Sequence, residues 1–180
     1  HLVDAEEYEE AEKLLKEVLE VNVNQPEAWA YRAVMAHLRN DPAKEKQFRA
    51  DALRHYTTNP AVDQLIGRKL SQKYRFAEGA AYQRLALKFD RNHLPAKFQL
   101  AQDLLRLGEE EEGWKLVADV HEADGYDVNA FNLVTLKDTT DKFVALTNAH
   151  FVVRMDAREA KIYGPRVLAL LQRAHDTLTK

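Results

Sequence analysis

The sequence contains no cysteine, which excludes disulfide bonds and thiolate catalysis. This absence does not identify the compartment, because oxidising and reducing environments both tolerate it. No apolar run approaches the roughly 18 residues that a membrane-spanning helix needs. The first stretch, His1 to Glu10, is acidic, whereas a signal peptide starts basic and then turns apolar. The sequence therefore predicts no membrane partner and leaves the localisation open.

The chain also lacks an excess of positive charge, since it contains 26 Lys and Arg and 29 Asp and Glu, which gives a formal net charge of -3. These charges are scattered along the sequence, so no basic stripe marks a nucleic-acid interface. Only six glycines are present, and none forms a phosphate-binding loop. An apolar fraction of 46% with 31% charged residues is typical of a folded protein. We expect no nucleic-acid partner.

No motif for metal binding or catalysis is complete. His121 and Glu122 begin a zinc-peptidase pattern, but Gly125 stands where the second histidine belongs. The remaining histidines do not recur at ligand spacing on one helix face. The run Glu109 to Glu112 lies at an expected first helical turn, where the helix dipole favours negative charge. We therefore predict no catalytic residue, no metal site and no cofactor, and expect that this chain is not an enzyme.

What the sequence does contain is an internal repeat of about 34 residues. Small residues align when the chain is shifted by that length, because a helical hairpin needs them where two backbones approach closely. One column is Ala33, Gly67 and Ala101, and a second is Ala11, Gly79 and Gly113, with Glu45 interrupting it. A third column contains Val18, Ala52, Ala86 and Val120.

On these columns the chain resembles the tetratricopeptide repeat (TPR) family over residues 4–137. The matching residues are Trp29 with Ala33, Ile66-Gly67, Leu100-Ala101, Tyr8 with Ala11, and the Val18 column. The usual proline after the second helix of each repeat is missing, and Val23, Thr57, Arg91 and Gly125 stand there instead. The resemblance implies a mainly α fold, a right-handed solenoid of helical hairpins.

The pattern predicts helices over residues 4–21, 26–39, 42–56, 60–73, 76–89, 94–107, 110–123 and 128–137. Residues 1–137 then form one domain, with a partial first repeat, three full repeats and the start of a fifth. The first helix has no partner before it, which leaves the apolar face that includes Leu14 and Leu15 uncovered. We therefore expect that the chain is part of a longer solenoid.

The sequence of residues 138–180 predicts a β–β–α appendage that differs from the helical repeats before it. Short strands are expected at 142–146 and 151–155, followed by a helix over 157–179 that Pro165 kinks or divides. A lone hairpin is marginally stable, so we interpret the appendage as the start of a further domain. The run from His150 to Leu171 resembles the entry to peptidase-MA-like (gluzincin) domains, which implies a zinc peptidase-like domain after Lys180.

In TPR proteins the first helices of successive repeats line a concave groove that binds peptides. The resemblance implies the following groove residues: Tyr31, Val34, His37, Gln64, Arg68, Gln72, Phe98, Gln99, Gln102 and Arg106. The family's carboxylate clamp needs asparagines where Val34, Arg68 and Gln102 stand, so a chaperone-tail receptor is disfavoured.

Three hypotheses for function remain. The first is a protein-interaction scaffold whose groove binds a peptide or a partner domain. The second is the non-catalytic N-terminal part of a larger metallopeptidase-like protein. In the third, the ends of the solenoid pair to form a dimer. The sequence does not identify the partner.

Overall fold

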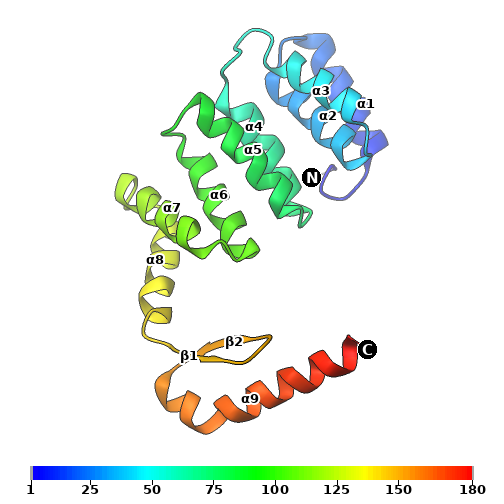
Figure 1. Cartoon of the computed structure of the whole chain (residues 1–180). Helices are drawn as coiled ribbons and strands as arrows, with labels where there is room; N and C mark the ends of the chain where they lie inside the picture. The colour runs from blue at the N-terminus through cyan, green and yellow to red at the C-terminus, as the bar shows by residue number, and fades with distance from the viewer. Residues whose placement is uncertain (1, 180) are drawn as a thin grey trace. The chain divides into compact units, whose positions relative to one another are not determined.

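The computed structural model describes residues 2–179, which form nine helices and one two-stranded sheet (Figure 1). The first seven helices are α1 (Tyr8–Val21), α2 (Pro26–Leu38), α3 (Pro42–Ala52), α4 (Pro60–Gln72), α5 (Phe76–Phe89), α6 (Leu94–Leu107) and α7 (Glu110–Ala123). The remaining elements are α8 (Val128–Thr140), β1 (Val144–Thr147), β2 (Val152–Met155) and α9 (Ala157–Leu178). No helix among the described residues is long and apolar enough to cross a membrane.

The predicted element order is confirmed, and several boundaries differ, most of them by one to three residues. The first helix begins at Tyr8, not at residue 4, because residues 2–7 form turns that bury Val3. Helix α3 ends at Ala52, four residues before the predicted end at 56. Helix α9 is continuous through Pro165, so the predicted division into two helices is not found.

The chain divides into two compact units, residues 1–125 and 126–180, of which 2–125 and 126–179 are described. The sequence predicts the division at residue 137, with the eighth helix opening a fifth repeat. In the structure α8 belongs to the second unit, and the stretch that would form its partner helix forms β1 and β2 instead. Thr135 also stands where the column of Ala33, Gly67 and Ala101 would continue.

The first unit is built from helical hairpins in which α2 packs on α3, α4 on α5 and α6 on α7. Successive hairpins are joined where α2 packs against α4 and where α5 packs against α6. The predicted column of small residues lies inside these hairpins, since Ala33 and Ala101 are 0% exposed and Gly67 is buried. The burial of this column confirms the basis of the predicted repeat.

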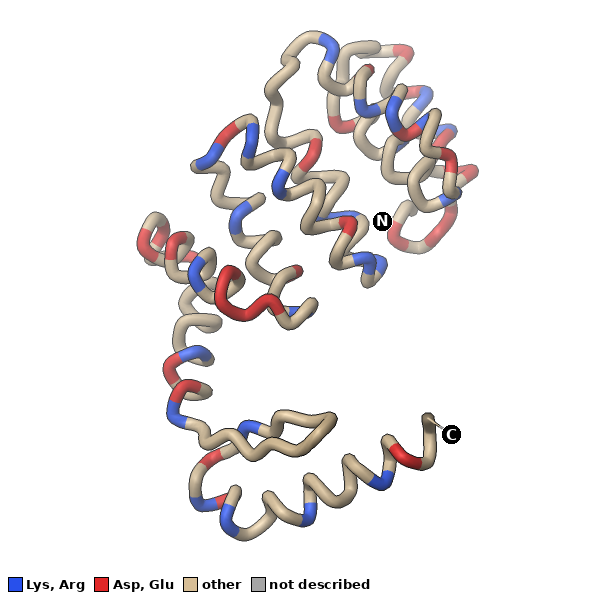
Figure 2. Tube along the Cα trace, in the orientation of Figure 1, with Lys and Arg blue, Asp and Glu red and all other residues tan. Residues whose placement is uncertain are grey.

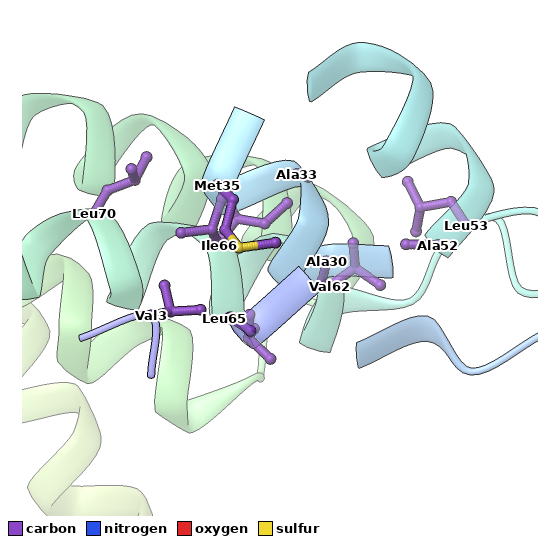
Figure 3. Packing of buried hydrophobic residues seen from close by; sticks show 12 residues of the cluster. Val3, Ala30, Ala33, Met35, Ala52, Leu53, Val62, Leu65, Ile66 and Leu70 are labelled. Carbon is purple, nitrogen blue, oxygen red and sulfur yellow. The ribbon is translucent and has the colours of Figure 1, made fainter. Parts of the chain in front are cut away.

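The largest apolar cluster lies between α2 and α4 (Figure 3). Its members from α4 include Val62, Leu65, Ile66 and Leu70, and those from α2 include Ala30, Ala33, Val34 and Met35. Val3, from the turn before α1, also joins this cluster. A smaller cluster of Ala80, Leu100 and Leu104 holds α5 and α6 together. Burial of these side chains supplies most of the driving force for the stacking of the hairpins.

Side-chain caps and prolines set where the helices begin. Asn59 accepts a hydrogen bond from the backbone N–H of Ala61 at 3.1 Å, and Pro60 occupies the first helical position of α4. Asp41 accepts from the N–H of Lys44 at 3.0 Å and precedes Pro42 in α3 in the same way. These local signals favour the observed starts of α3 and α4.

The turns within the hairpins repeat as regularly as the small residues do. Glu6, Asn40, Tyr74 and Gly108 have φ angles of 65°, 56°, 61° and 82°. In each turn the following N–H bonds the carbonyl five residues earlier, as from Asp41 to Ala36 at 2.9 Å. This is the Schellman ending of a helix, in which a left-handed residue closes the last turn. The repeat therefore extends to residues 2–7 in backbone geometry.

In the second unit, β1 and β2 pair antiparallel from Val144 opposite Met155 to Thr147 opposite Val152. Helix α9 packs against both strands. Gly164 permits this contact, because a Cβ at that position would lie 2.2 Å from Cδ1 of Leu146. Asp156 caps α9 by accepting from the N–H of Arg158 at 2.8 Å.

Replacement of Gly67 by alanine tests the close approach of α4 and α5. The new Cβ would lie 2.5 Å from Nε2 of Gln83 and 2.8 Å from the carbonyl oxygen of Gly79. We expect Gly67→Ala to lower the free energy of unfolding by about 1–3 kcal/mol, although helix propensity alone predicts a gain of about 1 kcal/mol. Urea unfolding followed by circular dichroism gives this value.

The control is the reverse substitution, Ala81→Gly, at an exposed position of α5. It should cost about 1 kcal/mol from helix propensity alone. A stabilised Gly67→Ala variant would contradict the role of Gly67 in the contact between α4 and α5.

Replacement of Tyr74 by glycine tests the repeated turn. Tyr74 is 83% exposed and left-handed, and an L-residue other than glycine is strained in that region. We expect Tyr74→Gly to raise the free energy of unfolding by about 0.5–1 kcal/mol, measured by thermal unfolding. Asn40→Gly should change it less, since asparagine tolerates this conformation. Equal gains in the two variants would show that strain at Tyr74 is not the cause.

Candidate protein-binding surface

The predicted groove corresponds to one face of α2, α4 and α6, which we call the inner face. Gly67 points toward α5, as the neighbours of its missing Cβ show. Residues about half a helical turn away, such as Leu65 and Lys69, therefore point to the opposite side, with Arg68 and Gln72 between. The inner face is defined as this side of α4 and the equivalent sides of α2 and α6.

The structure does not place all residues predicted on α2 at this surface. Val34 is 0% exposed and belongs to the apolar cluster shared with α4, so no ligand can reach it and its predicted place in the groove is corrected. Tyr31 is half-buried against the same cluster, and its ring lies 5.7 Å from Nζ of Lys69. The inner face of α2 is thus largely filled.

His37 is held by acidic residues of α3 and α5. Its Nδ1 lies 2.9 Å from Oε1 of Glu45, and its Nε2 contacts Glu78. The hydroxyl of Tyr82 donates to Glu45, and burial together with this hydrogen bond raises the pKa of Tyr82. Because its two ring nitrogens face these carboxylates, His37 connects hairpins and is not free for a ligand, which corrects its predicted role.

The groove residues predicted on α4 and α6 are more exposed to solvent than those predicted on α2. Arg68, Gln72 and Arg106 are exposed, whereas Gln64, Phe98, Gln99 and Gln102 are half-buried. The guanidinium of Arg106 lies 5.2 Å from the ring centroid of Phe76, a cation–π distance that limits its movement. The accessible part of the predicted site is therefore the inner face of α4 and α6.

A buried carboxylate orients one of these residues. Asp103 is 0% exposed and accepts hydrogen bonds from Oγ of Ser71 at 2.7 Å and from Nε2 of Gln99 at 3.0 Å. Burial raises the pKa of Asp103, while the bonds from Ser71 and Gln99 oppose that rise. Since Gln99 directs its amide N–H to Asp103, its carbonyl oxygen remains available as an acceptor.

Sequence reasoning missed Lys69 and Lys73. Nζ of Lys69 donates to both carboxylate oxygens of Asp4 at 2.9 Å, and Nζ of Lys73 donates to Glu6 at 2.8 Å. The hydrogen bond from Lys69 lowers the pKa of Asp4. The available signal was the spacing of two lysines one helical turn apart, Lys69 near the end of α4 and Lys73 directly after it, next to the predicted Arg68.

No group of three or more histidine or acidic side chains is arranged to hold a metal ion within residues 2–179. Two buried carboxylates of the first unit are paired with basic or hydroxyl groups, Asp63 with Arg49 and Asp103 with Ser71. The inner face presents hydrogen-bonding and charged groups.

The solved structures that resemble this chain contain tetratricopeptide repeats. The first TPR domain of Spaghetti (RPAP3), bound to an HSP90 peptide, has a TM-score of 0.51 and 14% identity, and the match covers 64% of this chain and 94% of that chain. The Arabidopsis OM64 TPR domain has a TM-score of 0.50 and 11% identity, with coverages of 64% and 95%. MamA has a TM-score of 0.53 and 12% identity, with coverages of 72% and 76%.

These likenesses show that the chain has the tetratricopeptide-type fold, as the sequence predicted. No family model and no curated protein matches the sequence. The comparisons give no support to the predicted resemblance of the C-terminal residues to peptidase-MA-like domains, and that resemblance stays a prediction.

The raised pKa of Asp103 predicts a pH dependence of stability. Asp103 binds its proton more tightly in the folded chain than in the unfolded one, where its ordinary value is 3.8. The stabilisation that this group adds to the folded state is therefore complete below pH 3.8. It is lost as the pH rises through the pKa of Asp103 in the folded chain. Urea unfolding from pH 3.5 to 7 should show this loss in the native chain and not in Asp103→Asn. Parallel pH profiles would contradict it.

Proposed function

We propose that the chain is a non-catalytic scaffold that binds an extended peptide, or a segment of a partner protein, on the inner face of α4 and α6. The observation that carries this proposal is that Arg68, Gln72 and Arg106 are exposed together on the inner face of two adjacent helices. Arg106 is exposed although its guanidinium also lies over the ring of Phe76 in α5. Phe98 adds an apolar surface to this set.

The chemistry of these side chains suits a polypeptide. Glutamine amides donate and accept, so they can bond the N–H and C=O groups of an extended backbone. Aromatic and arginine side chains are the residue types that most often dominate binding energy at protein interfaces. The first TPR domain of Spaghetti, which has the same fold, was solved with an HSP90 peptide bound. That complex supports a peptide ligand for this fold.

A double charge reversal tests the site. Peptides would first be selected on the purified chain from a displayed random library, and their affinities measured by fluorescence anisotropy. We expect Arg68→Glu with Arg106→Glu to weaken binding at least tenfold, because two favourable contacts become repulsive. The circular dichroism spectrum should not change, since both side chains are exposed.

The matched control is Lys88→Glu with Arg91→Glu, which makes the same charge change at exposed positions on and just after α5. This control should bind as the native chain does. Selected peptides that bind the double variant and the native chain equally, or a library that yields no binder, would overturn the proposal.

A further inference from the structure

The exposed charge on α4 and α6 is of one sign. Each helix carries one acidic residue, and both are buried at 0% exposure. Asp63 accepts two hydrogen bonds from Arg49 at 2.6 Å, and Asp103 is held by Ser71 and Gln99. The remaining charged side chains of these helices are Arg68, Lys69, Lys97 and Arg106. The exposed charges of α4 and α6 are therefore basic in a chain whose net charge is -3, and Figure 2 marks where the charged residues lie along the backbone.

An acidic segment already lies against part of this surface. Val3 is 6% exposed in the cluster between α2 and α4, while Asp4 and Glu6 are paired with Lys69 and Lys73. In these contacts the apolar side chain of Val3 is buried, and the two carboxylates pair with the amines of Lys69 and Lys73. The pairs satisfy the two lysines, whereas no hydrogen bond or ion pair to Arg68 is found within the described residues.

The spacing of the arginines limits the ligand. Arg68 and Gln102 occupy the same position of consecutive repeats, as do Gln72 and Arg106. For parallel neighbouring helices, this order places the two arginines at opposite corners of a rectangle with sides of about 9 Å between the helices and about 6 Å along a helix. Its diagonal is about 11 Å, close to the roughly 9 Å that three residues span in the polyproline II conformation, where side chains three positions apart lie on the same face.

We propose that the inner face of α4 and α6 recognises an acidic segment in the polyproline II conformation in which two carboxylates stand three positions apart, one bound by Arg68 and the other by Arg106. This inference rests on the proposed function and specifies its ligand. Gln72 and Gln102, at the remaining corners, hydrogen-bond the backbone of the segment. Charge-assisted bonds from a planar guanidinium to a carboxylate give this site its selectivity for acids.

The test uses blocked synthetic peptides, acetylated and amidated, so that no terminal carboxylate contributes. One peptide has two glutamates separated by two residues in a background of valine, serine and glycine. A second has the same glutamates adjacent, and a third has glutamines in their place. We expect the first to bind at least tenfold more tightly than the other two, with shifts in the NMR spectrum confined to α4, α6 and their neighbours.

Single variants assign each carboxylate. Arg68→Gln and Arg106→Gln should each weaken binding of the first peptide at least tenfold, while Lys88→Gln should leave it unchanged. Binding should also weaken as salt is raised, because the contacts are charge pairs at a solvent-exposed surface. Either arginine variant binding as the native chain does would overturn the assignment.

The outcomes separate this inference from the proposed function. If neutral peptides from the library bind the inner face and the glutamine peptide binds as well as the first, the surface binds peptides but acid recognition is wrong. If no peptide binds there, both proposals fail. A single-stranded oligonucleotide that binds more tightly than the acidic peptide, through the same arginines, would replace carboxylate recognition by phosphate recognition.

Discussion

The close approach of paired helices at Gly67 and Gly79 is the contact on which the rest of the first unit depends. A Cβ on Gly79 would lie 2.1 Å from Oγ of Ser71 and 3.0 Å from the carbonyl oxygen of Gly67. Two backbones at this separation allow little rotation of either helix about its axis. The contact therefore fixes which side chains of α4 point away from α5, and the inner face follows from it.

The repeat could be predicted from the sequence because close contact between backbones allows only small residues. Small residues therefore recur at the same position of successive repeats. The left-handed turn that recurs in each repeat could not be predicted in this way. Only Gly108 among its four members is a glycine, and Glu6, Asn40 and Tyr74 adopt the same conformation because the helix ending determines it. At Glu6 and Tyr74 the residue type gives no sign of this conformation, because the helix ending enforces it on residues that do not favour it.

The candidate site was only partly predictable for a related reason. Assigning groove residues by repeat position assumes that each repeat has the same neighbours. Val34 and Arg68 occupy the same position of consecutive repeats, but Val34 packs against the apolar residues of α4, whereas Arg68 is exposed to solvent. For His37 the sequence did hold a signal. Glu45 breaks the column of small residues, and its carboxylate is the group that lies 2.9 Å from that imidazole.

How neighbouring hairpins are joined determines where the inner face stays open. The first junction combines the packing of α2 on α4 with charged links such as the one between Arg49 and Asp63, and its inner side is filled by Val3 and its neighbours. At the second junction α5 packs along α6 through Ala80 and Leu100, so apolar burial joins the hairpins away from the inner face. The buried hydrogen bond from Ser71 to Asp103 also links α4 and α6 at this junction, whereas Arg68, Gln72 and Arg106 stay exposed.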